Sequence, residues 1–153
     1  MTFTTSPFAA PQRAGHMYTK VSLDTAIAAA SPHRLVAMLF EGLFESMAQA
    51  RGAIRGGDVA AKGRAIGKAV SILEEGLKGG LNLVEGGTLA KDLNDLYVYA
   101  IMRLTEANLH SDEQRIEECI RILKPLKEAW DAIGPQVEAQ AQAQPQSQPQ
   151  RQI

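Results

Sequence analysis

The sequence predicts an all-α protein, an antiparallel up-down four-helix bundle with a short N-terminal helix or strap and disordered ends. Apolar residues recur every three or four positions through the middle of the chain, and no stretch alternates with the period of a strand. Glycine pairs and capping residues divide this middle into four helical segments, each roughly 20 residues long. The short connections between them favour antiparallel neighbours.

The first predicted helix begins at Ser31-Pro32, because serine caps a helix and proline at the first helical position loses no needed hydrogen bond. Gly56-Gly57 ends this helix, and Asp58 caps the second, which we expect to end at Gly86-Gly87. The first apolar stripe comprises Leu35, Met38, Leu39, Leu43, Met47, Ala50 and Ile54. The second comprises Ile66, Ala69, Val70, Leu73, Leu77, Leu81 and Val84.

The third predicted helix is capped by Thr88 and carries a second apolar face in addition to its main stripe. This second face comprises Val98, Ile101 and Met102. A helix that is apolar most of the way round is either central or faces a partner.

The fourth predicted helix is capped by Ser111 or Asp112 and ends at Gly134-Pro135. Pro125 lies inside its pattern, where a proline removes one backbone donor and clashes with the preceding turn. We therefore expect a kink at Pro125, or two shorter helices in place of one.

The two ends of the chain differ from the middle. Residues 1–15 are rich in Thr, Ser and Pro, and residues 135–153 are rich in Gln and Pro, so both are predicted to be disordered. The folded bundle domain is expected over residues 16–134, and its first part, residues 17–30, is expected to form a short helix or an extended strap.

Composition excludes several classes of protein. The chain has 16 Lys plus Arg against 17 Asp plus Glu, and only 5% aromatic residues, which argues against a nucleic-acid-binding protein. The longest apolar run is the seven residues Leu96 to Met102, whereas a membrane span needs about 20. Residues 1–17 do not resemble a signal peptide, and one cysteine fits a reducing compartment, so we expect a cytoplasmic protein.

No catalytic or metal-binding pattern is present in the sequence. His16, His33 and His110 fall at loops or helix starts, and the Glu-x-x-His spacing of metal-binding bundles does not occur. We interpret His33 as a solvated histidine at a helix start, and we expect no metal, cofactor or small-molecule substrate and no enzymatic activity. A phosphotransfer-like signalling module, which needs an exposed histidine, is one alternative, and a self-associating bundle is another.

The apolar helix surface exceeds what one stripe per helix requires. Phe40 and Phe44 lie one turn apart beside the main stripe of the first helix, and Ile101 lies beside that of the third. These side chains either complete the core or line a groove that accepts an amphipathic helix from another protein.

Several segments, in order from about Tyr18 to Ile133, resemble the family of the flagellar secretion chaperone FliS. The main one is Ala30-Ser-Pro-His-Arg-Leu-Val-Ala-Met-Leu-Phe-Glu-Gly42. The others are Ile54–Asp58, Gly86–Tyr99, Leu104–Asn108 and Leu123–Trp130.

The resemblance implies a cytoplasmic helical chaperone that binds the C-terminal segment of newly made flagellin and delivers it to the flagellar export gate. That segment is expected to gain helix on the chaperone, which prevents premature polymerisation. On this basis we expect the flagellin groove to include Phe40, Phe44, Leu93, Tyr97 and Ile101. Tyr18 and Val21 match the family's N-terminal tyrosine-containing segment, which implies a cap that gives way to cargo.

Overall fold

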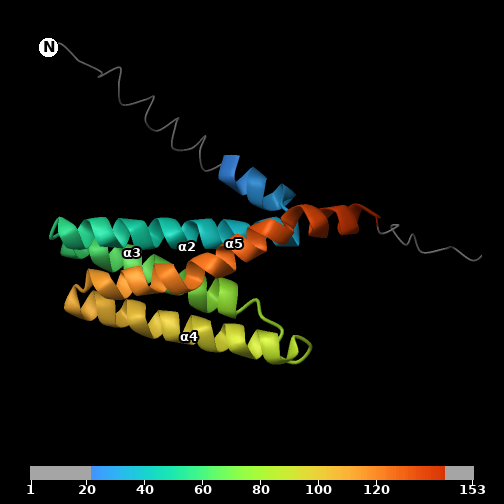
Figure 1. The fold of residues 1–153 in the computed structure, drawn as a ribbon. Coiled ribbons are helices and arrows are strands. Elements are labelled where there is room, and N and C mark those ends of the chain that lie inside the picture. The colour runs from blue at the N-terminus through green and yellow to red at the C-terminus, as the bar shows by residue number, and fades with distance from the viewer. Residues whose placement is uncertain (1–21, 144–153) are drawn as a thin grey trace, which may run out of the picture.

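The computed structural model describes residues 22–143, and every regular element in that range is helical (Figure 1). A helix over residues 22–29, called the N-terminal helix below, precedes the others. The others are, in order, α2 (Pro32–Arg55), α3 (Val59–Ser71), the π-helix η1 (Ile72–Lys78), α4 (Gly87–His110) and α5 (Glu113–Ala143). The chain runs up and down through them, so the prediction of an all-α helical bundle is confirmed (Figure 1).

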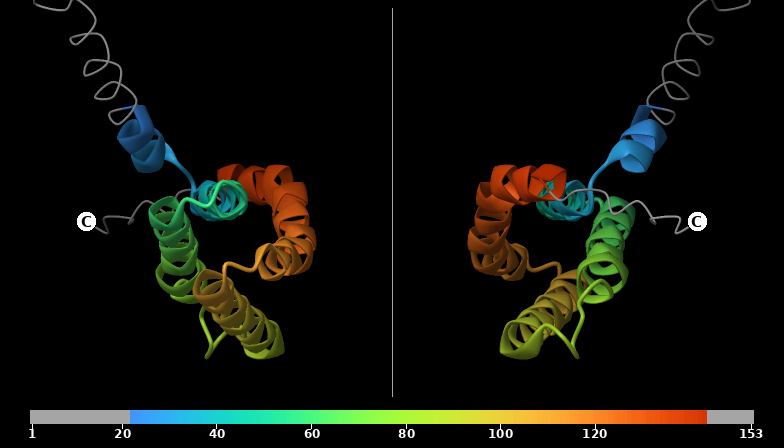
Figure 2. Two further views of the ribbon diagram at one scale, coloured as in Figure 1. Left: turned by 90° about the vertical axis from the view of Figure 1, so that its left-hand side faces the viewer. Right: turned by 90° about the vertical axis from the view of Figure 1, so that its right-hand side faces the viewer.

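The core is formed by the inward faces of α2, α3, η1, α4 and α5, which surround it when the bundle is viewed along its length (Figure 2). Its fully buried side chains include Leu43, Met47, Leu73, Leu104 and Leu123. Each large aliphatic side chain buried in this way contributes about 1.5–3 kcal/mol of hydrophobic stabilisation. The core therefore joins all the helices of the bundle, and it leaves the outer faces of α2 and α4 uncovered.

The start of α2 and the turn into α3 agree with the sequence-based prediction. The Ser31 hydroxyl accepts a hydrogen bond from the Arg34 backbone N–H at 3.1 Å, and Pro32 occupies the first helical position. Gly57 then adopts a φ of 68°, a left-handed conformation that suits glycine. Asp58 caps α3 by accepting a hydrogen bond from the Ala61 N–H at 3.0 Å.

The second predicted helix ends earlier than expected. After α3 the backbone widens into the π-helix η1, which ends at Gly79-Gly80 rather than at Gly86-Gly87. Two adjacent glycines disfavour helix, and the following loop is held by the Asn82 side chain, whose oxygen accepts hydrogen bonds from the backbone of Val84 and Glu85 at 3.2 and 3.0 Å. A loop held by the Asn82 side chain thus takes the place of the last turns predicted for the second helix.

The ends of α4 differ in how they are capped. The helix begins at Gly87 with Gly86 in the N-cap position and no side-chain cap, so the predicted cap by Thr88 is wrong. At its other end Ser111 adopts a left-handed φ of 49°. Asp112 then accepts a hydrogen bond from the Gln114 N–H at 3.0 Å, and it is therefore the residue that caps α5.

Helix α5 is longer than predicted. It passes through Pro125 as one helix, changes direction along its length (Figures 1 and 2) and continues through Pro135 to Ala143. Pro125 is exposed, so the backbone hydrogen bond that the proline removes lies on the solvent side of the helix, where its loss is least costly. The predicted stop at Gly134-Pro135 is wrong, and α5 extends into the segment 135–153 that the sequence assigned to a disordered tail.

A reciprocal contact between His33 and Trp130 explains why α5 continues. The rings stack with centroids 4.7 Å apart, His33 Nε2 donates to the Trp130 carbonyl at 2.7 Å, and Trp130 Nε1 donates to the His33 carbonyl at 3.1 Å. Gly134 makes room for this pair, because a Cβ there would lie 2.8 Å from His33 Cε1. The prediction of a solvated His33 is therefore wrong, since only 8% of the residue is exposed.

Ion pairs fix α5 against α2 at the opposite end of α2. Glu113 forms salt bridges with Arg55 and with Arg51, whose Nε lies 3.3 Å from the carboxylate. The hydrogen bond from Arg55, with a second from Arg51, holds the pKa of Glu113 below its ordinary value. The ionised carboxylate is therefore the form that joins the two helices.

A second set of polar contacts joins α5 to α4. The Tyr99 hydroxyl donates to the Glu118 carboxylate, and Arg103 Nη2 donates to the same group at 2.8 Å. The hydrogen bond from Tyr99, followed by that from Arg103, lowers the pKa of Glu118. These contacts occupy the side of α4 that faces α5 and leave its outer face free of them.

Candidate partner-binding surface

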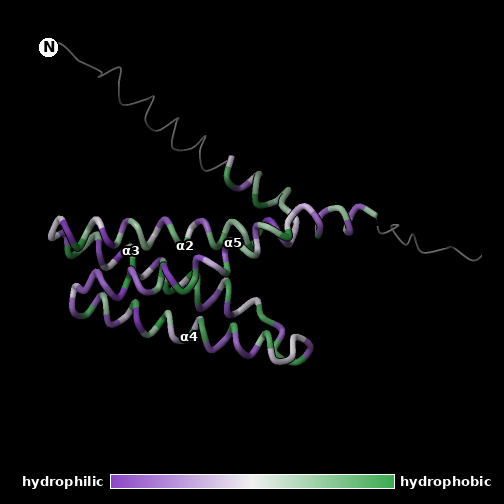
Figure 3. The backbone as a smooth tube through the Cα atoms, viewed as in Figure 1, coloured by the Kyte–Doolittle hydropathy of each residue, from purple (hydrophilic) through white to green (hydrophobic). Residues whose placement is uncertain are grey.

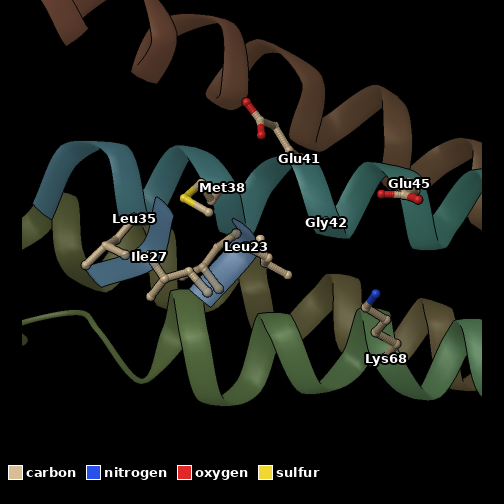
Figure 4. Close-up of a pocket in the computed structure, with 9 residues that line it drawn as sticks. Leu23, Ile27, Leu35, Met38, Glu41, Gly42, Glu45 and Lys68 are labelled. Carbon is tan, nitrogen blue, oxygen red and sulfur yellow. The ribbon is translucent and has the colours of Figure 1, made fainter. Parts of the chain in front are cut away.

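A groove of about 470 Å³ lies between the N-terminal helix, α2 and α3 (Figure 4). Its lining is mostly apolar, with three charged side chains at the margin. The lining residues are Leu23, Ile27, Leu35, Met38, Leu39, Gly42, Glu41, Glu45 and Lys68. An elongated apolar hollow between helices with a charged margin is suited to an amphipathic helix.

Two glycines let η1 pack closely against α2 beside the groove. A Cβ on Gly42 would lie 3.4 Å from Ile72 Cδ1, and a Cβ on Gly76 would lie 3.0 Å from Leu39 Cδ2. The close packing of η1 on Leu39 leaves the neighbouring part of α2, which carries Leu35 and Met38, without a bundle helix over it.

The N-terminal helix covers the groove only loosely. In Figure 4 the side chains of Leu23 and Ile27 lie between α2 and α3, yet 51% of Leu23 and 45% of Ile27 remain exposed. Every residue from 22 to 29 is exposed, although most are apolar (Figure 3). The segment thus contributes few buried contacts, which is typical of a part of a protein that opens at low energetic cost.

A second hollow of about 320 Å³ continues the groove along α2 and α3 toward the turn between them. It is lined by Gln49, Ala61, Arg64, Ala65 and Lys68. Lys68 lines both hollows, so together they form one surface, called the α2–α3 groove below.

The outer face of α4 is a separate apolar surface. Val98 is 47% exposed, Met102 49% and Leu109 77%, and their spacing places them on one side of the helix. The predicted second apolar face of this helix is therefore present at the surface, with Ile101 half-buried at its edge.

Comparison with known proteins identifies the family. A family described as "Flagellar protein FliS" matches residues 14–137. The flagellar secretion chaperone FliS of Salmonella typhimurium is 45% identical over 123 residues, which cover 80% of this chain and 91% of that protein. FliS of Vibrio cholerae is 39% identical over 119 residues, covering 78% of this chain and 87% of its own length.

FliSB of Pseudomonas aeruginosa, also named a flagellar secretion chaperone, is 40% identical over 121 residues, covering 79% of this chain and 95% of its own length. The chain belongs to the FliS family. The resemblance stated from the sequence is confirmed. The prediction that the chain is not an enzyme is also confirmed, because these FliS relatives are named as chaperones.

The structure divides the FliS groove residues predicted from the sequence into two groups. Phe40 is 2% exposed and Tyr97 4%, so both lie in the core, where burial raises the pKa of Tyr97 to about 12. Phe44, Leu93 and Ile101 are half-buried and pack against the core with one side. The first two side chains are not available to a partner in this conformation, whereas the other three are partly accessible.

The predicted cap residues Tyr18 and Val21 lie outside the described residues. The structure instead places Leu23 and Ile27, from the same predicted strap, over the groove of this FliS chain. Both belong to the apolar pattern of residues 17–30, but the sequence does not show which surface that pattern meets.

The sequence also assigned Leu35 and Met38 to the core stripe of the first helix, whereas the structure places them at the groove. Within residues 22–143 no helix is both long and apolar enough to cross a bilayer. In the same range, no group of three or more His, Cys, Asp or Glu side chains is arranged to hold a metal ion.

Proposed function

We propose that the chain is a cytoplasmic export chaperone that binds the C-terminal segment of flagellin and delivers it to the flagellar type III export apparatus. The observation that carries this proposal is the α2–α3 groove, an apolar surface covered only by a loosely packed helix. Membership of the FliS family supports it, because the curated relatives are named flagellar secretion chaperones.

The cargo segment is proposed to enter as an amphipathic helix whose apolar stripe replaces Leu23 and Ile27 in the groove. Further cargo contacts are proposed along the half-buried Phe44, Leu93 and Ile101 and on the outer face of α4. Covering the cargo's apolar stripe in this way prevents it from pairing with other flagellin molecules. Ordering a flexible segment also lowers its affinity per unit area, which favours release at the export gate.

The test is titration of the protein with the C-terminal segment of the organism's flagellin, followed by calorimetry and circular dichroism. We expect saturable one-to-one binding and a gain of helix on mixing. Met38→Asp should weaken binding at least tenfold, because it puts a charge on the apolar wall of the groove, while thermal melting persists. Ala129→Asp, at an exposed position of α5, is the matched control.

Two results would contradict the proposal: absence of binding by the wild-type protein, or equal affinity of the folded Met38→Asp variant and the control. The phosphotransfer alternative is not supported at His33, whose ring is buried and hydrogen-bonded to Trp130. If the chain proves to be a stable dimer that excludes the flagellin segment, the function would instead be self-association.

A further inference from the structure

The two sides of the α2–α3 groove carry opposite charge. Arg64 and Lys68 lie one turn apart on the α3 side, and neither forms a salt bridge with another residue in the range 22–143. On the α2 side lie Glu41 and Glu45, also one turn apart. Figure 4 shows Glu45 and Lys68 on different helices at the same end of the hollow.

The charges on the α2 side differ in how far they are already compensated. Glu41 is paired with Arg34 at 2.9 Å, so its charge is largely balanced within α2. Among residues 22–143, Glu45 has no salt bridge and receives one side-chain hydrogen bond, from the neutral Gln49 amide at 3.5 Å. Within this described part of the chain, the uncompensated charges along the groove are therefore one carboxylate on α2 and two cations on α3.

Charge on the margins of a helix-binding groove selects direction as well as partner. An amphipathic helix has two flanks beside its apolar stripe, and turning it end for end exchanges the margins that these flanks meet. Charged positions beside an apolar seam set orientation in paired helices by the same principle. From Leu35 to Gln49 the α2 side spans about 21 Å, enough for roughly four turns of helix.

We propose that the bound helix is held in one direction by charge pairing along the two sides of the groove. Its flanks pair with Arg64 and Lys68 on one side and with Glu45 on the other. The occupant is a partner helix with acidic residues on the flank that meets α3 and basic residues on the flank that meets α2. This inference rests on the proposed function for the identity of the cargo. The charges of the groove on which it is built do not depend on that proposal.

The test uses the full chain and three synthetic helical peptides that share one apolar stripe and differ only in their flanks. The mixed peptide has Glu on one flank and Lys on the other, whereas the acidic and basic peptides have the same charge on both. At low ionic strength we expect the wild-type protein to bind the mixed peptide about fivefold more tightly than either of the others.

Charge reversal should then change the preference predictably. Glu45→Lys makes both sides basic, so the acidic peptide should become the tightest ligand, whereas Arg64→Glu with Lys68→Glu makes both sides acidic and should favour the basic peptide. Lys124→Glu, at an exposed site on α5, is the matched control and should keep the wild-type order. All of these positions are on the surface, and urea unfolding verifies that each variant is folded.

Direction is measured with a nitroxide at the N-terminus of the mixed peptide. The nitroxide should broaden the NMR methyl signal of either Met38 or Ala61, which mark opposite ends of the groove. When the Glu and Lys flanks of the peptide are exchanged, the broadening should move to the residue at the other end. Broadening that stays at one end for both arrangements would overturn the inference, and so would an unchanged peptide preference in the reversed variants.

Failure of all three peptides to bind, or a dimer that closes the groove to them, would also overturn it. The native flagellin segment is titrated separately against the same variants. If the peptides behave as expected and flagellin does not bind, the proposed function fails and the inference stands. If flagellin binds and charge reversal changes nothing, the inference fails alone.

Discussion

Releasing the N-terminal helix from the groove should raise the affinity for cargo. The perturbation is the double substitution Leu23→Ser with Ile27→Ser, which removes both apolar side chains that this helix places over the groove. If the cargo occupies the same surface as the helix, as proposed, cargo should bind only to the fraction of molecules in which the groove is open.

The expected gain in cargo affinity follows from the exposed fractions of these two side chains. Leu23 is 51% exposed and Ile27 45%, so each buries about half of its surface. Full burial of a Leu or Ile side chain contributes about 1.5–3 kcal/mol, so the two half-buried side chains together hold the helix with at most about 3 kcal/mol, before the entropy of ordering the segment is subtracted. Loss of this contact should strengthen apparent cargo binding by up to about 150-fold.

The assay is fluorescence anisotropy of the labelled flagellin C-terminal segment, with Ala28→Ser as an exposed control in the same helix. The free energy of unfolding of the bundle should change little, since Leu23 and Ile27 lie outside its core. Weaker binding by the double variant would refute the competition argument and show that these side chains contact the cargo. Equal binding would show that the helix does not restrict access.

Two further predictions concern the scaffold. Gly134→Ala should destabilise the protein by about 1–3 kcal/mol, because the new methyl would lie 2.8 Å from a ring atom of the buried His33. The control is Gly67→Ala, in α3 with open space around its Cβ position, which should be neutral or stabilising. Equal urea midpoints for the two variants would contradict the packing argument. The carboxyl pKa values of Glu113 and Glu118 are lowered in the folded state, so their stabilising contribution is present above the unfolded pKa of about 4.3 and is lost as pH falls through the folded values. Stability should therefore decrease below about pH 4.5 by less in a Glu113→Gln, Glu118→Gln variant than in the wild type, as measured by urea unfolding across pH; an identical pH dependence would assign the acid sensitivity to other groups.

The starts of the helices follow from local chemistry, and the sequence therefore locates them well. Ser31 and Asp58 each accept a hydrogen bond from a backbone N–H three residues ahead, so the cap is complete within one turn. Such features depend on no distant contact. The FliS resemblance likewise rests on ordered local segments, and the comparisons confirm it.

The ends of the helices depend on contacts that are distant in sequence. A Gly-Pro pair normally ends a helix, but Gly134 packs against His33, and the stacked Trp130 holds α5 on α2, so the helix continues. Conversely, the apolar stripe that runs to Val84 suggests a longer second helix than the structure contains, because η1 ends at a glycine pair and Asn82 organises a loop.

Periodicity alone also fails to separate core from groove. Helix α2 is apolar over a wide arc, and both Phe40 and Met38 fit its stripe, yet Phe40 is buried in the core while Met38 lines the α2–α3 groove. The difference arises from which neighbouring helices cover each side of α2, and this information is not local. The sequence predicts an excess of apolar helix surface but does not locate it.

The most direct test of the groove as the cargo site is photo-crosslinking. A benzophenone amino acid at position 38 in α2 and, separately, at position 129 in α5 would be irradiated in the presence of the flagellin C-terminal segment. We expect a crosslinked adduct from position 38 and none from position 129. Adducts from position 129 alone, in a protein that binds the segment with wild-type affinity, would contradict the placement of the cargo in the α2–α3 groove.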